Sequence, residues 1–242
     1  MVTGGATNIG RGITEGFLEE GDRVVVGQPD PAVAEPLVRR HGDRVIPLRV
    51  DVGDAGQCRD FIEEAARLLE GIDVLVNNAA ITGSAAFSRF EGMAVRQMDE
   101  ILRVNIGGVL YCAQAVLPHL RTAGGGVIVN ISSVNAFRPQ RGAMVYAATK
   151  AAVCSLTQSL ARELAGDRIR VVAVAPGDVR TDASAELERD VRAQGIVSDV
   201  AGQTPLGQGT PEDVAGIVCF LCSAQARFVT GVTWVVDGGW LA

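Results

Sequence analysis

The sequence predicts an α/β fold in which helices cover both faces of a doubly wound parallel sheet of about seven strands. Short β-branched runs alternate with longer stretches of helical periodicity, and a glycine-rich turn opens the chain. The runs are apolar nearly throughout, which is typical of strands buried on both faces of a parallel sheet. The 242 residues contain no linker and no internal repeat. We therefore expect one domain spanning 1–242.

The expected elements follow one another along the chain. After a stub at 1–2, β-branched runs lie at 23–26, 44–50, 72–76, 126–131, 169–174 and 232–236. Helical periodicity fills the intervals, at 10–20, 32–41, 55–69, 92–120, 144–165 and 211–223. The last helix has a clear start, because Pro211 and two acidic residues follow Thr210.

The first strand is short. Only Met1 and Val2 precede Thr3 and Gly4, whereas a strand usually has about 5–6 residues. Since this strand is expected in the middle of the sheet, a short version would leave backbone groups of its neighbours unpaired. We therefore expect either that the natural protein begins several residues earlier or that contacts between subunits compensate.

Composition excludes several classes of protein. With 48% hydrophobic and 21% charged residues, the chain is not disordered. No long uninterrupted apolar run indicates a membrane-spanning helix. A net charge of −6, with both signs interspersed, argues against binding to nucleic acid or to an anionic membrane. The opening residues do not have the order of a signal peptide, so we expect a cytoplasmic protein.

The cysteines do not indicate a metal site. There are five, an odd number, mostly in apolar helical surroundings, and we expect them to be reduced core residues. Cys219 and Cys222 have a spacing found in metal and redox sites, but they lie in an apolar helix and no second pair accompanies them. We expect no bound metal.

The turn at residues 3–10, with the sequence TGGATNIG, predicts a phosphate-binding site. Glycines let the backbone turn tightly and approach a pyrophosphate, which then lies at the N-terminus of the following helix. We expect Gly4, Asn8, Ile9 and Gly10 to bind a dinucleotide there. Asn8 stands where this pattern usually has glycine, but asparagine tolerates left-handed backbone better than most residues.

Tyr146 and Lys150 predict proton-transfer chemistry. They lie four residues apart on an expected helix, hence on one face, and Lys150 is the only lysine in the chain. A phenol with a pKa near its usual value of about 10 is a fair acid, and a nearby ammonium would lower that pKa and stabilise the phenolate. Ser133 follows the strand at 126–131 and can orient a substrate oxygen, while alternation points Ser132 to the other face. This set fits interconversion of a ketone or aldehyde and an alcohol by hydride transfer.

With these motifs the chain resembles the short-chain dehydrogenase/reductase family over essentially its whole length. The resemblance is nearest to 3-oxoacyl-reductase-like and sugar-dehydrogenase-like members. Further matching segments are Asp51-Val52, Asn77-Asn78-Ala79-Ala80 and Pro176-Gly177 with Thr181. Asn8 and Ala80 depart from the family pattern, which has glycine at both places. The resemblance implies a Rossmann domain, an NAD(P) cofactor and a homotetramer.

The resemblance also assigns site residues. It implies that Asn105 joins Ser133, Tyr146 and Lys150 in catalysis, through a water held by its backbone carbonyl. The expected cofactor-binding residues are Gly4, Asn8, Ile9, Gly10, Gln28, Asp51, Val52, Asn78, Ala79, Ala80, Tyr146, Lys150, Pro176, Gly177, Val179 and Thr181.

The choice between NADP and NAD depends on the end of the second strand. An acidic residue there would bind the ribose diol of NAD and repel the extra phosphate of NADP. The decisive place holds the neutral Gln28, and Asp30 lies further along the chain. The sequence therefore favours NADP over NAD by a small margin.

The substrate should be bound by the segments that follow the later strands, at 81–91, 134–141 and 182–209. We interpret the last as a substrate lid. Asn135, Arg138 and Gln140 are candidates to meet a polar or acidic substrate. The glycines at 124–126 and Asp167 stand where carrier-protein reductases often have basic residues, which weakens an acyl-carrier interpretation. The sequence predicts a small carbonyl or alcohol substrate without naming it.

Two other functions remain open. One is an isomerase or dehydratase that uses the cofactor transiently on the same scaffold. The other is a noncatalytic, dinucleotide-binding regulatory protein, which a broken Ser-Tyr-Lys set would favour. Here the set is complete.

Overall fold

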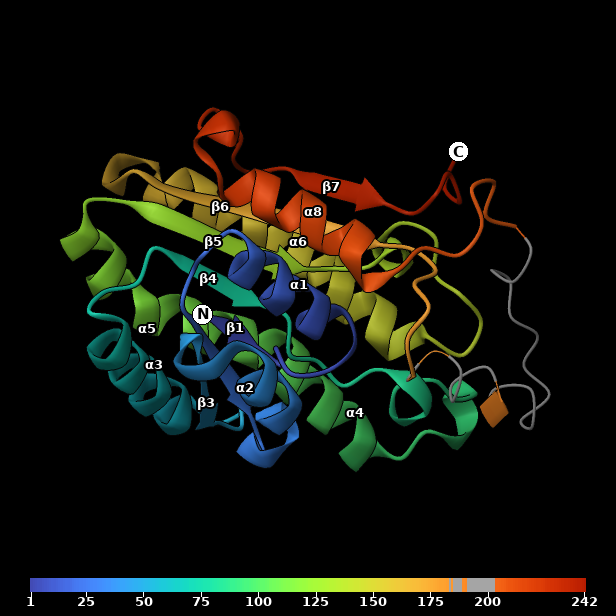
Figure 1. Ribbon diagram of the computed structural model, residues 1–242. Helices are drawn as coiled ribbons and strands as arrows, with labels where there is room; N and C mark the ends of the chain where they lie inside the picture. Colours follow the sequence, from blue (N-terminus) through green and yellow to red (C-terminus); the bar gives the residue numbers. More distant parts are fainter. Residues whose placement is uncertain (183, 185–188, 191–202) are drawn as a thin grey trace.

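The computed structural model describes residues 1–182, 184, 189–190 and 203–242. Its centre is a parallel sheet of seven strands in the order β3-β2-β1-β4-β5-β6-β7 (Figure 1). The strands are β1 (Val2–Thr3), β2 (Val24–Gln28), β3 (Val45–Arg49), β4 (Val74–Asn77), β5 (Gly126–Ile131), β6 (Ile169–Pro176) and β7 (Thr233–Val236). The strand order reverses between β1 and β4, which is where such sheets bind ligands. The predicted α/β class is confirmed.

Helices cover both faces of the sheet (Figure 1). The principal helices are α1 (Asn8–Glu19), α2 (Glu35–His41), α3 (Ala55–Leu69), α4 (Val95–Leu102), α5 (Gly108–Ala123), α6 (Met144–Leu164) and α8 (Pro211–Cys222). The alternation of strand side chains separates two cores. In β2, Val24 and Val26 pack with α1, α2 and α8, while Val25 between them packs with α3, α5 and α6. This is the period of two that a sheet buried on both faces requires.

The stretch expected as one helix at 92–120 is interrupted. A 3-10 turn, η4 (Phe90–Gly92), precedes α4, and a π-helical turn, η5 (Arg103–Gly107), separates α4 from α5. The chain packs closely just after this turn, because a Cβ at Gly108 would meet the side chain of Val52 at 2.8 Å. π-turns often occur at functional sites, and η5 carries Asn105.

The expected helix at 32–41 also starts differently. Its first turn is a 3-10 turn, η1 (Pro31–Ala34), and α2 follows it. The carboxylate of Asp30 accepts a hydrogen bond from the Ala32 amide at 3.1 Å and so caps that turn. Asp30 is thereby held in a structural role.

The segment Val95–Ala123 is long and apolar enough, by composition, to cross a membrane. In the structure its Cys112, Val116 and Leu120 side chains are fully buried in the core against the sheet. It is packed as a core helix of the domain.

The short β1 pairs with both of its neighbours. Val2 lies opposite Val26 of β2 and Val76 of β4. The flanking residues extend the ladder, since the Gly4 amide donates to the Gly27 carbonyl at 2.7 Å and the Val76 amide donates to the Met1 carbonyl at 2.9 Å.

Candidate active site

One cavity of about 860 Å³ runs along the carboxyl ends of the strands. Its wall includes the predicted cofactor-binding residues from the first turn to the end of β6: Gly4, Asn8, Ile9, Gly10, Gln28, Asp51, Val52, Asn78, Ala79, Ala80, Tyr146, Lys150, Pro176, Gly177, Val179 and Thr181. Ser133 lies on the same wall. The residues that sequence reasoning grouped together are therefore brought to one site.

The glycine-rich turn is held in shape by the end of β4. The Asn78 amide group donates to the carbonyl oxygens of Thr3 and Gly4, at 3.0 Å each. A Cβ at Gly10 would overlap both the Gly4 carbonyl and this amide, so only glycine fits there. Asn8 has a φ of 50°, as expected for an asparagine that replaces glycine in this turn.

The first turn of α1 can receive a phosphate. Thr7, the residue before the helix, makes no side-chain hydrogen bond to the helix start. The positive end of the helix dipole therefore faces the cavity without a side-chain cap. This is the geometry that a pyrophosphate needs.

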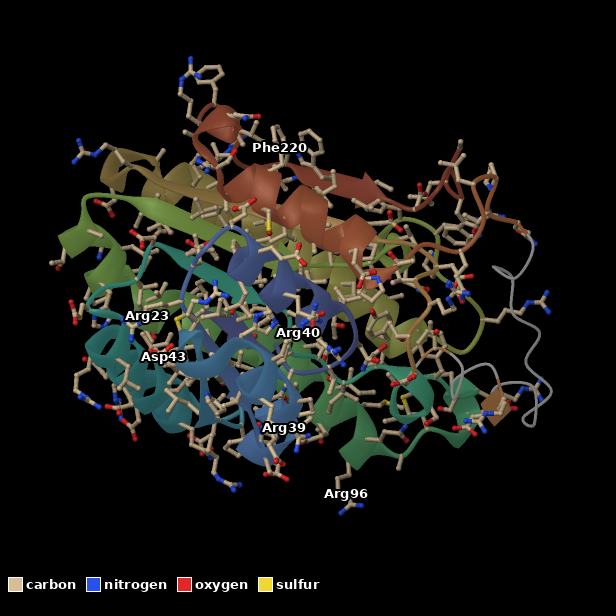
Figure 2. The ribbon with its side chains drawn as sticks, in the orientation of Figure 1. Arg23, Arg39, Arg40, Asp43, Arg96 and Phe220 are labelled. Atoms are coloured by element: carbon tan, nitrogen blue, oxygen red, sulfur yellow. The ribbon has the colours of Figure 1, made fainter. Side chains whose placement is uncertain are left out.

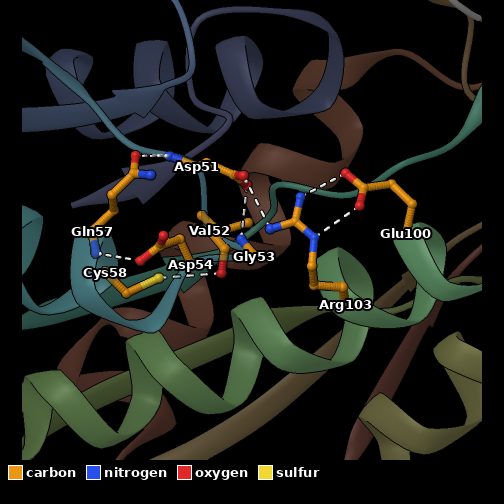
Figure 3. A network of polar contacts seen from close by, with 8 residues as sticks. All are labelled: Asp51, Val52, Gly53, Asp54, Gln57, Cys58, Glu100 and Arg103. Atoms are coloured by element: carbon orange, nitrogen blue, oxygen red, sulfur yellow. Dashed lines mark hydrogen bonds and ion pairs between the residues drawn. The ribbon is translucent and has the colours of Figure 1, made fainter.

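The far rim of the cavity is a polar network around Arg103 (Figure 3). Arg103 makes an ion pair with Asp51 at 3.0 Å and with Glu100 at 2.6 Å. The other oxygen of Asp51 accepts a hydrogen bond from the Gly53 amide at 2.9 Å. The guanidinium lies directly over Gly53, where a Cβ would overlap it. Arg103 thus links the start of η5 to the loop after β3, whose Asp51 and Val52 were expected to bind the cofactor.

Gln28 supplies a test of whether a dinucleotide fits. Its side chain is 8% exposed, and its amide nitrogen has no hydrogen-bond partner among the described residues. A buried donor without a partner is unfavourable unless a ligand or a water satisfies it. Because Gln28 lines the cavity, a ribose hydroxyl or its phosphate placed there would accept this hydrogen bond. The residues present therefore fit the cofactor.

Tyr146 lies on α6 with its hydroxyl directed at the cavity. The side chain is 9% exposed, and its ring packs against Phe87 with centroids 5.6 Å apart. Burial raises the pKa of Tyr146 above its usual range, while hydrogen bonds with Ser133 and Thr82 act in the opposite direction. The phenol is therefore protonated at neutral pH, as a general acid must be.

Lys150 lies beneath Tyr146 and is buried. Its Nζ donates to the Ile131 carbonyl at 2.8 Å and lies 5.6 Å from the centre of the Tyr146 ring. Burial lowers the pKa of Lys150 to about 8. In the polypeptide alone, burial raises the pKa of Tyr146 more than the hydrogen bonds with Ser133 and Thr82 lower it. That Lys150 lowers this pKa together with the positive nicotinamide ring stays a prediction.

The two serines after β5 have different partners. The Ser132 hydroxyl donates to the backbone carbonyl of Lys150 at 2.9 Å and faces away from the phenol. Ser133 bonds to Tyr146 instead. This difference favours Ser133 as the residue that meets a substrate oxygen.

Asn135 has a role that the sequence did not indicate. It was a candidate for substrate contact and lines the cavity, although it is largely buried. Both its backbone and its side-chain nitrogens approach the Ser133 hydroxyl oxygen, at 3.2 and 3.5 Å. Its side-chain oxygen accepts from the Gln140 amide at 2.9 Å. Asn135 therefore fixes Ser133 as a donor toward the cavity and shapes the loop that follows.

Asn105 does not line the cavity. It is 1% exposed and its side chain bonds both backbone groups of Ile81, at 2.7 and 3.0 Å. It also approaches the Thr149 hydroxyl at 3.3 Å, and Thr149 in turn donates to the Tyr146 carbonyl. Asn105 connects the loop after β4 to the helix that carries Tyr146.

The expected substrate-binding segments are only partly described. Most of the predicted lid at 182–209 lies outside the described residues, and of this stretch Ser184 and Gln208 line the cavity. Arg138 is turned away, with its guanidinium 4.8 Å from the centre of the Trp240 ring. Gln140 lines the cavity, and so do Thr82 and Arg141 of the expected segments 81–91 and 134–141, and Arg180, which lies outside the expected segments. The order of strands and loops predicts the segments, but without periodicity no sequence signal singles out these residues within them.

Several known proteins are similar to this chain in sequence or in structure. Residues 4–241 match the family model described as "Enoyl-(Acyl carrier protein) reductase". The chain is 37% identical to a 3-oxoacyl-[acyl-carrier-protein] reductase of Aquifex aeolicus, over 99% of this chain and 95% of that protein. It is 35% identical to a 2-(R)-hydroxypropyl-CoM dehydrogenase of Xanthobacter autotrophicus, over 100% and 98%. A crystal structure of a 3-ketoacyl-(acyl-carrier-protein) reductase from Brucella melitensis, complexed with NADH, matches with a TM-score of 0.90 and 32% identity, over 100% of this chain and 97% of that one.

Proposed function

Since this chain belongs to the short-chain dehydrogenase/reductase family and is an NAD(P)-dependent oxidoreductase, we propose that it interconverts a small ketone or aldehyde and the corresponding alcohol with Tyr146 as general acid and base. The observation that carries the proposal is the buried Tyr146 on a cavity wall shared with Ser133 and Lys150, with the Lys150 Nζ 5.6 Å from the centre of the Tyr146 ring. The bound nicotinamide supplies or accepts the hydride. The residues of the chain bind the cofactor and the substrate, orient the reacting oxygen and move the proton.

Reduction of a carbonyl needs a proton on the oxygen as hydride reaches the carbon. Ser133 donates a hydrogen bond to the substrate oxygen and holds it near the phenol. Tyr146 then delivers the proton from its hydroxyl, and Lys150, with its pKa near 8, stabilises the resulting phenolate. In oxidation the same groups act in reverse. Asn105 and Thr149 connect α6 to the loop after β4 by hydrogen bonds, and they thereby support the position of Tyr146 in the site.

For the cofactor, we propose NADP in preference to NAD. Two observations support this. The neutral Gln28 amide lies on the cavity wall at the end of β2, and the carboxylate of Asp30 caps η1. The end of β2 therefore has no carboxylate directed at the extra phosphate of NADP, which it would repel. Steady-state kcat/KM values for both cofactors test this. A preference for NAD would overturn it.

We also propose a cytoplasmic homotetramer with a small-molecule substrate. Exposed apolar side chains on α5 and around β7, such as Leu110 and Val235, support an association of copies. No surface of nucleic-acid or membrane type is expected from the net charge.

The test of the proposed reaction is turnover with a panel of ketones and alcohols and both cofactors, followed at the nicotinamide absorbance. Stoichiometric change in that absorbance with product identifies a net redox enzyme. Product formed without net change in absorbance would identify an isomerase or dehydratase. Cofactor binding without turnover would favour the regulatory alternative.

A further inference from the structure

The catalytic end of the cavity carries two arginines that form no ion pair with a described residue. Arg141 lies on the loop before α6, Arg180 follows β6, and both line the cavity that contains Tyr146. Both side chains are exposed, and neither guanidinium has a hydrogen bond or an ion pair anywhere in the described part of the chain. The other arginines near the cavity are engaged: Arg138 with Trp240, and Arg103 with Asp51 and Glu100.

The backbone on which each arginine sits is fixed. Before Arg141, the Gln140 amide donates to the Asn135 side chain at 2.9 Å, and after it the Gly142 carbonyl accepts from the Ser88 amide at 2.9 Å. The amide of Arg180 donates to the Gly209 carbonyl at 2.9 Å. Two cations on anchored loops lose less entropy on binding than cations on free loops.

Among the described residues that line the cavity, the carboxylates are those of Asp51, Glu100 and Asp178. Asp51 and Glu100 are paired with Arg103 at the far rim. Asp178 accepts a hydrogen bond from the neutral amide of Gln208 at 3.0 Å, so its negative charge remains and offsets one cation. Lys150 adds a third cation, buried behind Tyr146. The catalytic end is thus locally positive in a protein whose net charge is −6, which is the arrangement that attracts and orients an anion.

We propose that the substrate of this enzyme carries an anionic group in addition to its carbonyl or hydroxyl, and that Arg141 and Arg180 bind this group while Ser133 and Tyr146 hold the reacting oxygen. The inference rests on the proposed function. A guanidinium is matched in shape by carboxylate, phosphate and sulfonate, each of which can accept two parallel hydrogen bonds. The shared chemistry is therefore an oxo compound with a tetrahedral or planar oxyanion at its other end.

The test compares oxo acids with their uncharged esters. The probes are laevulinate and longer oxo carboxylates, each against its methyl ester, and an oxoalkyl phosphate to separate phosphate from carboxylate recognition. The variants are Arg141→Gln, Arg180→Gln and the double variant. Arg96→Gln is the matched control, because Arg96 is an exposed arginine of α4 that points away from the body of the protein (Figure 2).

We expect the wild-type enzyme to prefer at least one acid over its ester in kcat/KM. Each single variant should lose about tenfold on the acid and nothing on the ester. The double variant should show no preference, and Arg96→Gln should behave as wild type. Equal losses on acid and ester, a raised KM for the cofactor in place of the substrate, or no acid preference in the wild type would each overturn the inference. If no ketone of either kind changes the nicotinamide absorbance, the proposed function itself fails.

Discussion

At the scale of single residues, the adjacent Ser132 and Ser133 should differ most clearly in what their loss does to turnover and to stability. Ser133→Ala removes the hydroxyl that bonds Tyr146 and should lower kcat by about 100-fold. Ser132→Ala removes a buried hydrogen bond to the Lys150 carbonyl and should leave kcat nearly unchanged while lowering the free energy of unfolding by about 1 kcal/mol. Steady-state kinetics and urea unfolding of both variants check this. The assignment fails if Ser132→Ala is the variant that loses turnover.

Lys150 gives a prediction about pH and stability. Burial lowers its pKa from 10.5 to about 8, so between these values the unfolded chain binds a proton that the folded chain does not. The free energy of unfolding of the wild type therefore rises with pH across this window. Relative to Lys150→Met, the wild type should gain about 2 kcal/mol between about pH 7.5 and about pH 9.5. Urea unfolding at both pH values measures it, and a constant difference would contradict the buried ammonium.

Sequence reasoning at this scale succeeded where a residue type and a spacing carry the chemistry. The left-handed conformation of Asn8 and the shared face of Tyr146 and Lys150 follow from backbone sterics and helical period. The contacts of Thr82 and Asn135 could not be predicted, because they depend on how irregular loops fold over the strand ends. The raised pKa of Tyr146 was missed because burial is a property of the packed structure.

At the scale of elements, the junction of α4 and η5 is joined to the cofactor cavity through Arg103 (Figure 3). Arg103→Gln should raise the KM for the cofactor several-fold and leave kcat unchanged. The reason is that the loop of Asp51 and Val52 loses the ion pair that holds it to η5. Its effect on stability should be below about 1 kcal/mol, since the ion pairs are partly exposed. Arg96→Gln, on the preceding helix α4, is the control. An unchanged cofactor KM in Arg103→Gln would show that the network does not serve the cavity.

Element boundaries were predicted best where the signal is local. The strand at 126–131 and the helix at 55–69 match β5 and α3 at both ends. The helix is delimited by the Asp54 side chain, which accepts from the Gln57 amide at 2.9 Å, and by Glu70 in the left-handed conformation. The interruption of 92–120 by η5 has no signal in the periodicity, and the chain just after it packs closely against Val52, which is far away in the sequence.

At the scale of the whole molecule, the exposed apolar surface predicts association. The ring of Phe220 in α8 (Figure 2) packs against that of Trp234 in β7, tilted by 58° with centroids 5.7 Å apart. Phe228 and Val235 are exposed. Burying such side chains between copies would be favourable. We expect a tetrameric mass by light scattering at micromolar concentration. Val235→Glu should shift the mass downward, and a monomeric wild type would contradict the proposed assembly.

The measurement that tests the central claim most directly is the turnover of Tyr146→Phe. Phenylalanine keeps the ring that packs on Phe87 and removes only the hydroxyl, so the fold and the cofactor cavity should persist. We predict a loss of about 10²–10⁴ in kcat, with the Kd for NADPH, measured by fluorescence titration, unchanged. Turnover near that of the wild type would contradict proton transfer by Tyr146.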